Sequence, residues 1–208
     1  MNTSTTGAPQ HRAAEAPDAA VPVRRPGSPA PHPALAVVTQ ETVVTRASAR
    51  RALALARLGT AVVFLWPFAD KLFGLGYATP AEGAWLAGGA PAQGYLEHGA
   101  QGPLAGTFAS MAGPATDWLF MLGMLGTGLA LLLGIGVRAA AVCGGLLFAM
   151  LWLSTWPVAA GSHNPVVDQH VVVILLLAVL ATTLAGDTWG VGRRWAALPV
   201  VTRSPWLR

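Results

Sequence analysis

Five ionisable side chains could carry chemistry in a chain that has few charges. Asp70 and Lys71 are adjacent, Asp117 stands alone in an apolar stretch, and Asp168 and His170 are two residues apart. A carboxylate, an amine or an imidazole can transfer a proton or hold a polar ligand. Their spacing along the chain matches no catalytic signature, so these groups can act together only if the fold gathers them in one place.

Other motif-like stretches fail in their context. Residues 134–139 read GIGVRA, the letters of a dinucleotide fingerprint, but they lie between two long apolar runs with no strand pattern before them. A membrane haem needs two histidines at matching depth, and only His170 falls inside an apolar run. His163, Asp168 and His170 are suitable metal ligands without signature spacing, so we expect no metal and no resident cofactor. A single cysteine, Cys143, excludes a disulfide scaffold and favours a packed small residue.

Composition indicates that membrane helices must position these side chains. Hydrophobic residues make up 53% of the chain and charged residues 11%, against about 25% charge in soluble domains. This deficit argues against a soluble enzyme, and it argues against a nucleic-acid binder despite the net charge of +4. Long runs without Asp, Glu, Lys or Arg fill residues 118–186 apart from Arg138 and Asp168. A membrane span needs about 20 apolar residues, which predicts helices near 115–136, 138–157 and 166–185.

The first predicted span, residues 53–75, must draw charge into the membrane. Only the twelve residues between Arg57 and Asp70 are uncharged, and at about 1.5 Å per residue they cannot cross a core of about 30 Å. We expect Arg57 to snorkel toward the inner surface. Asp70 and Lys71 then lie in the outer part of the span, beyond a kink at Pro67.

Basic residues predict the orientation of a multi-pass protein of the cell membrane. Of thirteen Lys and Arg residues, seven precede residue 58, one is Arg138 and four follow residue 192. The positive-inside rule then places both termini in the cytoplasm. The orientation thereby places five ionisable groups in one outer layer: Asp70, Lys71, Asp117, Asp168 and His170. We expect Lys71 to pair with Asp117 or Asp168 beside His170, as a proton-handling or ligand-binding site; the alternatives are a clasp that fixes helix register and carboxylates that only reach headgroup water.

The remaining segments complete an all-α polytopic membrane four-helix bundle. Residues 1–50, rich in Pro and Ala, predict a disordered cytoplasmic tail; a twin-arginine signal at Arg24-Arg25 is the weaker reading, since no continuous apolar core follows. Residues 51–198 form the transmembrane domain, and 199–208 a cytoplasmic C-terminal tail. The outer loop 76–113 predicts short interfacial helices that act as a lid, a binding segment or a plain cover.

Rows of small residues predict where the second and third spans approach each other. Small residues recur every fourth position in both spans, and such rows permit close backbone packing in lipid. A chain this rich in Gly and Ala also produces such rows by chance. The two rows are Gly126, Ala130, Gly134 and Ala141, Gly145, Ala149.

Several stretches of the chain resemble the DoxX family of small bacterial membrane proteins, and its actinobacterial type in particular. These stretches read ARLGTAVVFLWPFADKLFGLGY, YATPAEGAWL, DWLFMLGMLGTGLALLLGIGVRAAA, NPVVDQH and GDTWGVGRRW. The resemblance covers about residues 50–198 and implies a four-helix membrane bundle with both ends in the cytoplasm. Positions that match the family's recurrent pattern are Arg57, Trp66, Asp70, Lys71, Asp117, Arg138, Asp168 and His170.

The resemblance also implies a function. The family takes its name from a subunit of an archaeal thiosulfate:quinone oxidoreductase, its members are often labelled thiosulfate dehydrogenase (quinone) subunits, and a mycobacterial relative is associated with a superoxide dismutase and a sulfurtransferase. It implies a membrane subunit of a redox or thiol/oxidative-stress system. A diffusible quinone would bind near Trp66, Asp70, Lys71 and His170. Soluble sulfur-transfer or redox proteins, or further copies of the chain, would be its partners.

Two other functions stay open. A non-catalytic scaffold that anchors soluble partners would need no turnover from Asp70, Lys71 and Asp168. A small transporter or lipid-binding protein would need a continuous polar cavity, which four spans with so few polar residues disfavour.

Overall fold

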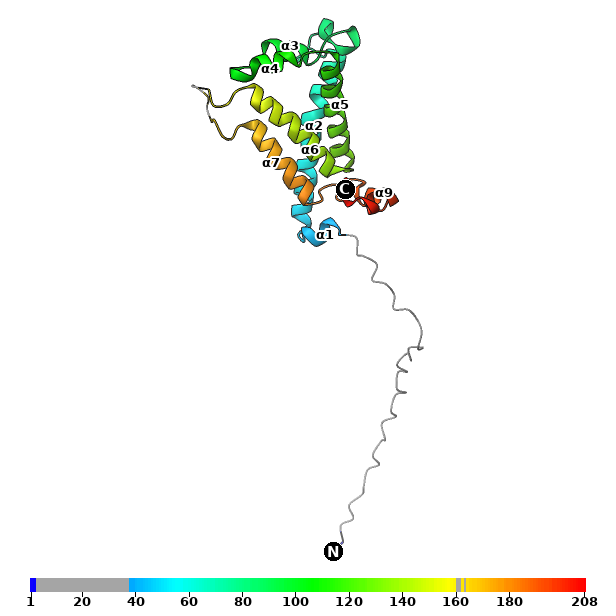
Figure 1. Ribbon diagram of the computed structural model, residues 1–208. Coiled ribbons are helices and arrows are strands. Elements are labelled where there is room, and N and C mark those ends of the chain that lie inside the picture. The colour runs from blue at the N-terminus through cyan, green and yellow to red at the C-terminus, as the bar shows by residue number, and fades with distance from the viewer. Residues whose placement is uncertain (3–37, 160–161, 163) are drawn as a thin grey trace. The chain divides into compact units, whose positions relative to one another are not determined.

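All regular structure in the described residues is helical. The computed structural model describes residues 1–2, 38–159, 162 and 164–208. Three of its helices are long and apolar enough to cross a membrane (Figure 1): α2 (Ala47–Phe73), α5 (Pro114–Leu133) and α6 (Val137–Ser154). These confirm the predicted all-helical class and its membrane-like character.

A fourth apolar helix, α7 (Gln169–Thr182), is shorter than its predicted span of 166–185. Its 14 residues cover about 21 Å. Asp168 caps its start by accepting hydrogen bonds from the backbone N–H groups of His170 and Val171. The chain leaves the helix after Thr182 because Leu184 takes a positive φ of 51° and turns the backbone toward the other helices.

The four helices pack pairwise: α2 contacts α5 and α7, and α6 contacts α5 and α7. Phe64, Leu131, Leu177 and Leu180 are buried between them. Glycine permits the closest approaches. A Cβ at Gly144 would lie 2.8 Å from the Phe64 ring and from the Thr127 methyl group.

The predicted rows of small residues mark close contacts only in part: a Cβ on Gly134 would lie 2.7 Å from the Gly186 carbonyl oxygen. A Cβ on Gly126 or Gly145 would meet nothing within 4 Å. The contact positions are Gly128, where a Cβ would lie 2.6 Å from Leu65, and Gly144. A row every fourth residue marks one helix face, but the sequence does not say which face meets a neighbour. Gly128 lies two residues after Gly126, and Gly144 lies one residue before Gly145.

The outer segment, defined as residues 76–113, joins α2 to α5 and contains five short helices. We call the end of the long helices that carries it the outer end, and the opposite end the inner end. The short helices are η1 (Ala81–Gly83), η2 (Trp85–Ala87), α3 (Gln93–His98), η3 (Gly102–Leu104) and α4 (Ala105–Ser110). Short helices were expected in this loop; that they lie at a membrane interface stays a prediction.

Folded segments before α2 and after α7 lie at the inner end, and the first of them corrects the predicted boundary of the disordered tail. Residues 38–50 are not a tail, because they contain α1 (Gln40–Val43) and the start of α2. The rest of the predicted disordered tail, residues 3–37, lies outside the described residues. Residues 199–208 are likewise folded. They follow α8 (Gly192–Ala196) as α9 (Pro199–Arg203) and η4 (Pro205–Leu207).

Asp187 holds these two ends together. Its carboxylate accepts the backbone N–H of Gln40 at 2.9 Å and the Arg208 guanidinium at 2.8 Å. The Arg208 carbonyl in turn accepts the backbone N–H of Arg138, 3.1 Å away, at the start of α6. The segments before α2 and after α7 are therefore tied to the helices by buried polar contacts.

An exposed ion pair between Glu41 of α1 and Arg193 of α8 lies at the same end. Burial raises the pKa of Glu41, but hydrogen bonds from its own backbone and Thr39 and the charges of Arg193 and Arg50 outweigh burial. The pKa of this carboxyl is therefore below its ordinary value. Because both side chains are solvent-exposed, the pair contributes little to stability.

Candidate functional site

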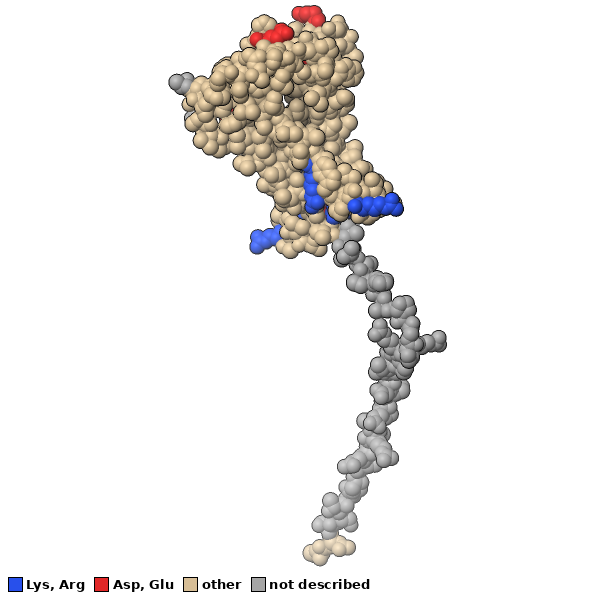
Figure 2. All heavy atoms as spheres, in the orientation of Figure 1, with Lys and Arg blue, Asp and Glu red and all other residues tan. Residues whose placement is uncertain are grey.

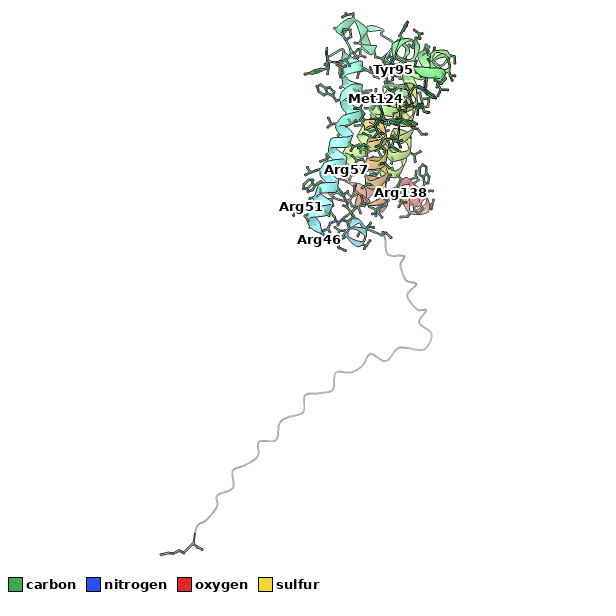
Figure 3. The ribbon with its side chains drawn as sticks, turned by 90° about the vertical axis from the view of Figure 1, so that its left-hand side faces the viewer. Arg46, Arg51, Arg57, Tyr95, Met124 and Arg138 are labelled. Atoms are coloured by element: carbon green, nitrogen blue, oxygen red, sulfur yellow. The ribbon has the colours of Figure 1, made fainter. Side chains whose placement is uncertain are left out.

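A cavity of about 400 Å³ lies between the outer halves of α2, α5 and α6. We call it the outer cavity. Phe64 and Pro67 line it from α2, Phe120 and Met124 from α5, and Phe148 from α6. The outer segment covers it, since residues of α3 and α4 complete the wall. In Figure 3, Tyr95 marks the outer end of this region and Met124 lies deeper along the helices.

Few polar side chains reach the outer cavity, and all of them lie toward its outer end. Lys71, Tyr95, Thr116 and Ser154 are part of its lining. The hydroxyl groups of Tyr95 and Ser154 are 2.7 Å apart and form a hydrogen bond. The cavity is thus an apolar chamber with a small polar rim, unlike the continuous polar path that a transporter of small solutes would need.

Asp70 holds the start of the outer segment. It is only 2% exposed, and its two carboxylate oxygens accept the backbone N–H groups of Tyr77 at 3.2 Å and Ala78 at 3.0 Å. Within the described residues, no carboxylate lies within 4 Å of the Lys71 ammonium. Asp70 and Lys71 are neighbours in sequence, but the Asp70 carboxylate bonds to the outer segment whereas Lys71 lines the outer cavity.

Asp117 anchors the part of the outer segment that covers the cavity. It lies in the first turn of α5 and is 4% exposed. Its carboxylate accepts the backbone N–H of Ala92 at 2.7 Å and the side-chain amide of Gln93 at 2.5 Å. Because Ala92 also lines the outer cavity, this bond fixes one wall of the chamber.

Asp168 and His170 form a pair of their own at the start of α7. The His170 ring nitrogen Nδ1 lies 2.6 Å from a carboxylate oxygen of Asp168. The ring packs at 5.8 Å from that of Phe148, whose side chain lines the outer cavity. Neither Asp168 nor His170 is part of the lining, and the third residue of the suggested metal set, His163, lies outside the described residues.

The predicted pairing of Lys71 with Asp117 or Asp168 is therefore wrong among the described residues. The physical reason is that backbone N–H groups of nearby loops and helix starts already use these carboxylates as acceptors. Only Lys71 of the five reaches the outer cavity. Trp66, the suggested quinone contact, is 47% exposed and stacks edge-on against Tyr77 at 5.0 Å, outside the lining.

Tyr95 and Ser154 are polar residues of the cavity that were not predicted from the sequence. Tyr95 belongs to a loop whose helices are too short to show a periodic pattern. Ser154 carried a weak signal, because it is a hydroxyl near the outer end of an otherwise apolar span. Neither position reveals from sequence that the two hydroxyls meet across 59 residues.

Arg57 forms a second polar centre, at the inner end. It is fully buried, so the expectation that it snorkels to the surface is wrong. Its guanidinium donates to five backbone carbonyls: those of Leu131 and Leu132 in the last turn of α5, and those of Ala185, Thr188 and Trp189 in the segment between α7 and α8. This arrangement satisfies carbonyls that a helix end leaves unpaired and makes Arg57 a structural clasp.

Glycines let the backbones meet around this clasp. A Cβ on Gly186 would lie 2.2 Å from the Gly134 carbonyl oxygen, and one on Gly190 would lie 2.4 Å from that of Gly186. Residues 134–139 accordingly form the turn between α5 and α6 and the first residues of α6. Their fingerprint-like letters reflect backbone packing rather than nucleotide binding.

Comparison of the chain with protein-family models, with curated proteins and with solved structures found no match.

Proposed function

We propose that the protein is a four-span bundle in the cell membrane with both termini in the cytoplasm. Figure 2 supports this with Lys and Arg near the inner end and Asp and Glu at the outer end, the asymmetry that the positive-inside rule describes. In this arrangement α7 completes the fourth crossing together with the non-helical residues that follow it. Leu184 and Ala185 are buried against protein, where irregular backbone is tolerated at membrane depth.

We further propose that the outer cavity binds a quinone and that the protein is the membrane subunit of a redox or thiol-stress system. The apolar chamber with a polar rim is the observation that carries this proposal. Its volume of about 400 Å³ is in the range of small-molecule sites. Lys71 can donate a hydrogen bond to a quinone oxygen, while Phe64, Met124 and Phe148 contact the ring and chain. The DoxX resemblance supports the choice of quinone among apolar ligands.

The proposed reaction balances with thiosulfate as the electron donor. Two thiosulfate ions join through a new S–S bond to give tetrathionate and release two electrons. One quinone takes up these electrons and two protons to become a quinol. In this proposal a soluble sulfur-transfer or redox partner binds thiosulfate, and this chain holds the quinone in the membrane.

The test combines binding with turnover. The protein, purified alone and with its co-purifying partners, is incubated with decylubiquinone and thiosulfate, and quinone absorbance is followed. We expect saturable quinone binding by the chain alone and quinone reduction only with partners. Absence of binding in the purified chain, together with no reduction in the partner complex, would falsify the proposal.

A scaffold is the second candidate, and one observation favours it. Asp70 and Asp117 are occupied in holding the outer segment and Asp168 in capping α7, which is what purely structural residues do. The scaffold predicts that Lys71→Met leaves partner recovery and any turnover of the complex unchanged. Quinone binding predicts that the same variant lowers turnover while partner recovery stays the same.

A further inference from the structure

The outer cavity is open on one side. Among its lining residues, Met111, Leu119 and Met150 are 42%, 73% and 39% exposed. They belong to three successive elements: Met111 ends α4, Leu119 lies in the outer half of α5, and Met150 lies in the outer half of α6. All three side chains are apolar and flexible, so the exposed part of the lining is apolar.

Helices α5 and α6 both contribute to the exposed side of the cavity. The two helices are joined at the inner end by the short turn at Gly134–Gly136. They are still in contact at mid-length, where a Cβ on Gly123 would lie 3.1 Å from the Leu147 side chain. Side chains of both helices line the cavity at this level and outward of it, Met124 and Leu119 from α5 and Leu147 and Met150 from α6.

The deep end of the cavity is apolar, and its polar side chains lie at the outer end. The deep end is closed by Phe64 and Phe148, whose rings meet edge-on at 5.3 Å, and by Met124. At the outer end the Tyr95 and Ser154 hydroxyls bond to each other. The Lys71 ammonium has no carboxylate within 4 Å in the described residues. A charge next to so much apolar surface is stabilised by an electron-rich partner.

We infer that the outer cavity admits a single-chain amphiphile sideways from the bilayer, between α5 and α6. Lys71 selects ligands whose head carries an acceptor oxygen. This inference deepens the proposed function and rests on it for the quinone, which is one such amphiphile. A fatty acid anion shares the chemistry of an apolar chain with an acceptor head, and the experiment separates the two.

The experiment uses the full chain in lipid nanodiscs, with tritiated decylubiquinone and tritiated laurate as probes and empty nanodiscs as the blank. Leu119→Trp places a bulky side chain at the opening. Leu122→Trp is its matched control, because Leu122 is also exposed on α5 but does not line the cavity. Lys71→Met removes the charge, and Lys71→Arg restores it.

We expect Leu119→Trp to slow both uptake and release of the bound probe severalfold with little change in affinity, and Leu122→Trp to leave both rates unchanged. Lys71→Met should weaken affinity roughly tenfold, the loss of one charged hydrogen bond, and Lys71→Arg should recover most of it.

Each other outcome also decides the matter. If decylubiquinone binds and the variants behave like the unaltered protein, the inference is overturned while the proposed quinone binding stands. If only laurate binds, with the expected variant pattern, the inference stands and quinone is the wrong ligand. If neither probe binds, both fail.

Discussion

Several buried polar side chains in this protein satisfy backbone groups, namely the Arg57 guanidinium and the carboxylates of Asp70 and Asp117. Arg57 has five N–H donors, and its contacts match them to carbonyls in the last turn of α5 and in the segment after α7. The partial negative charge at a helix C-terminus stabilises the cation without a carboxylate. Asp70 and Asp117 do the reverse, by accepting from backbone N–H groups of the outer segment.

Removal of Arg57 should therefore destabilise the fold strongly. Arg57→Met leaves several buried carbonyls unpaired, each at a cost of about 1–3 kcal/mol, so we expect a loss of at least about 3 kcal/mol. Arg51→Met, an exposed position on the same helix, should change little. Unfolding in detergent followed by circular dichroism measures both. Equal stability of the two variants would show that the clasp does not hold the helix ends.

The carboxylate of Asp117 should control the order of the outer segment alone. Asp117→Ala removes the acceptor for Ala92 N–H and the Gln93 amide, at about 1–3 kcal/mol. We expect at least roughly tenfold faster amide exchange in α3, with no change in α7. Asp168→Ala is the reciprocal control, since it should affect the first turn of α7 and spare α3. Exchange that rises equally throughout the chain in both variants would argue against local anchoring.

At the scale of elements, adjacent glycines of α6 provide a sharp test of the packing. Gly144→Ala places a methyl group 2.8 Å from Phe64 and Thr127, and such overpacking costs about 1–3 kcal/mol. Gly145→Ala meets open space and removes a glycine from a helix interior, which should be neutral or stabilising by up to about 1 kcal/mol. Unfolding in detergent compares the two variants. If Gly144→Ala were more stable than Gly145→Ala, the face of α6 assigned to the helix interface would be wrong.

The sequence predicts elements better than it predicts which elements meet. Long runs without charge locate α5 and α6. Helix α2 is located by a shorter run, the twelve uncharged residues between Arg57 and Asp70. The same uniform apolarity hides the packing face, and so the glycine rows pointed to Gly126 and Gly145 rather than to Gly128 and Gly144. The outer cavity could not be predicted, because its rim joins Lys71, Tyr95 and Ser154 from distant parts of the chain.

At the scale of the whole molecule, the two ends of the helices differ in construction. The outer end is covered by the outer segment, whose buried anchors are carboxylates. The inner end is closed by both terminal segments around Arg57 and Asp187, with Arg194 and Arg203 exposed beside them. An end rich in exposed arginine suits the anionic inner surface of a membrane, while the outer cavity lies at the opposite end.

Site-directed labelling tests this orientation. In a Cys143→Ser background, which removes the single cysteine, a cysteine is placed at exposed Glu82 in the outer segment or at exposed Arg194 in α8. An impermeant maleimide applied to intact cells should label Glu82→Cys at once. Arg194→Cys should react only after the membrane is opened, because its charged neighbours hold it on the cytoplasmic side. Labelling of both positions from the same side of an intact membrane would mean that the three long helices and α7 do not complete an even number of crossings.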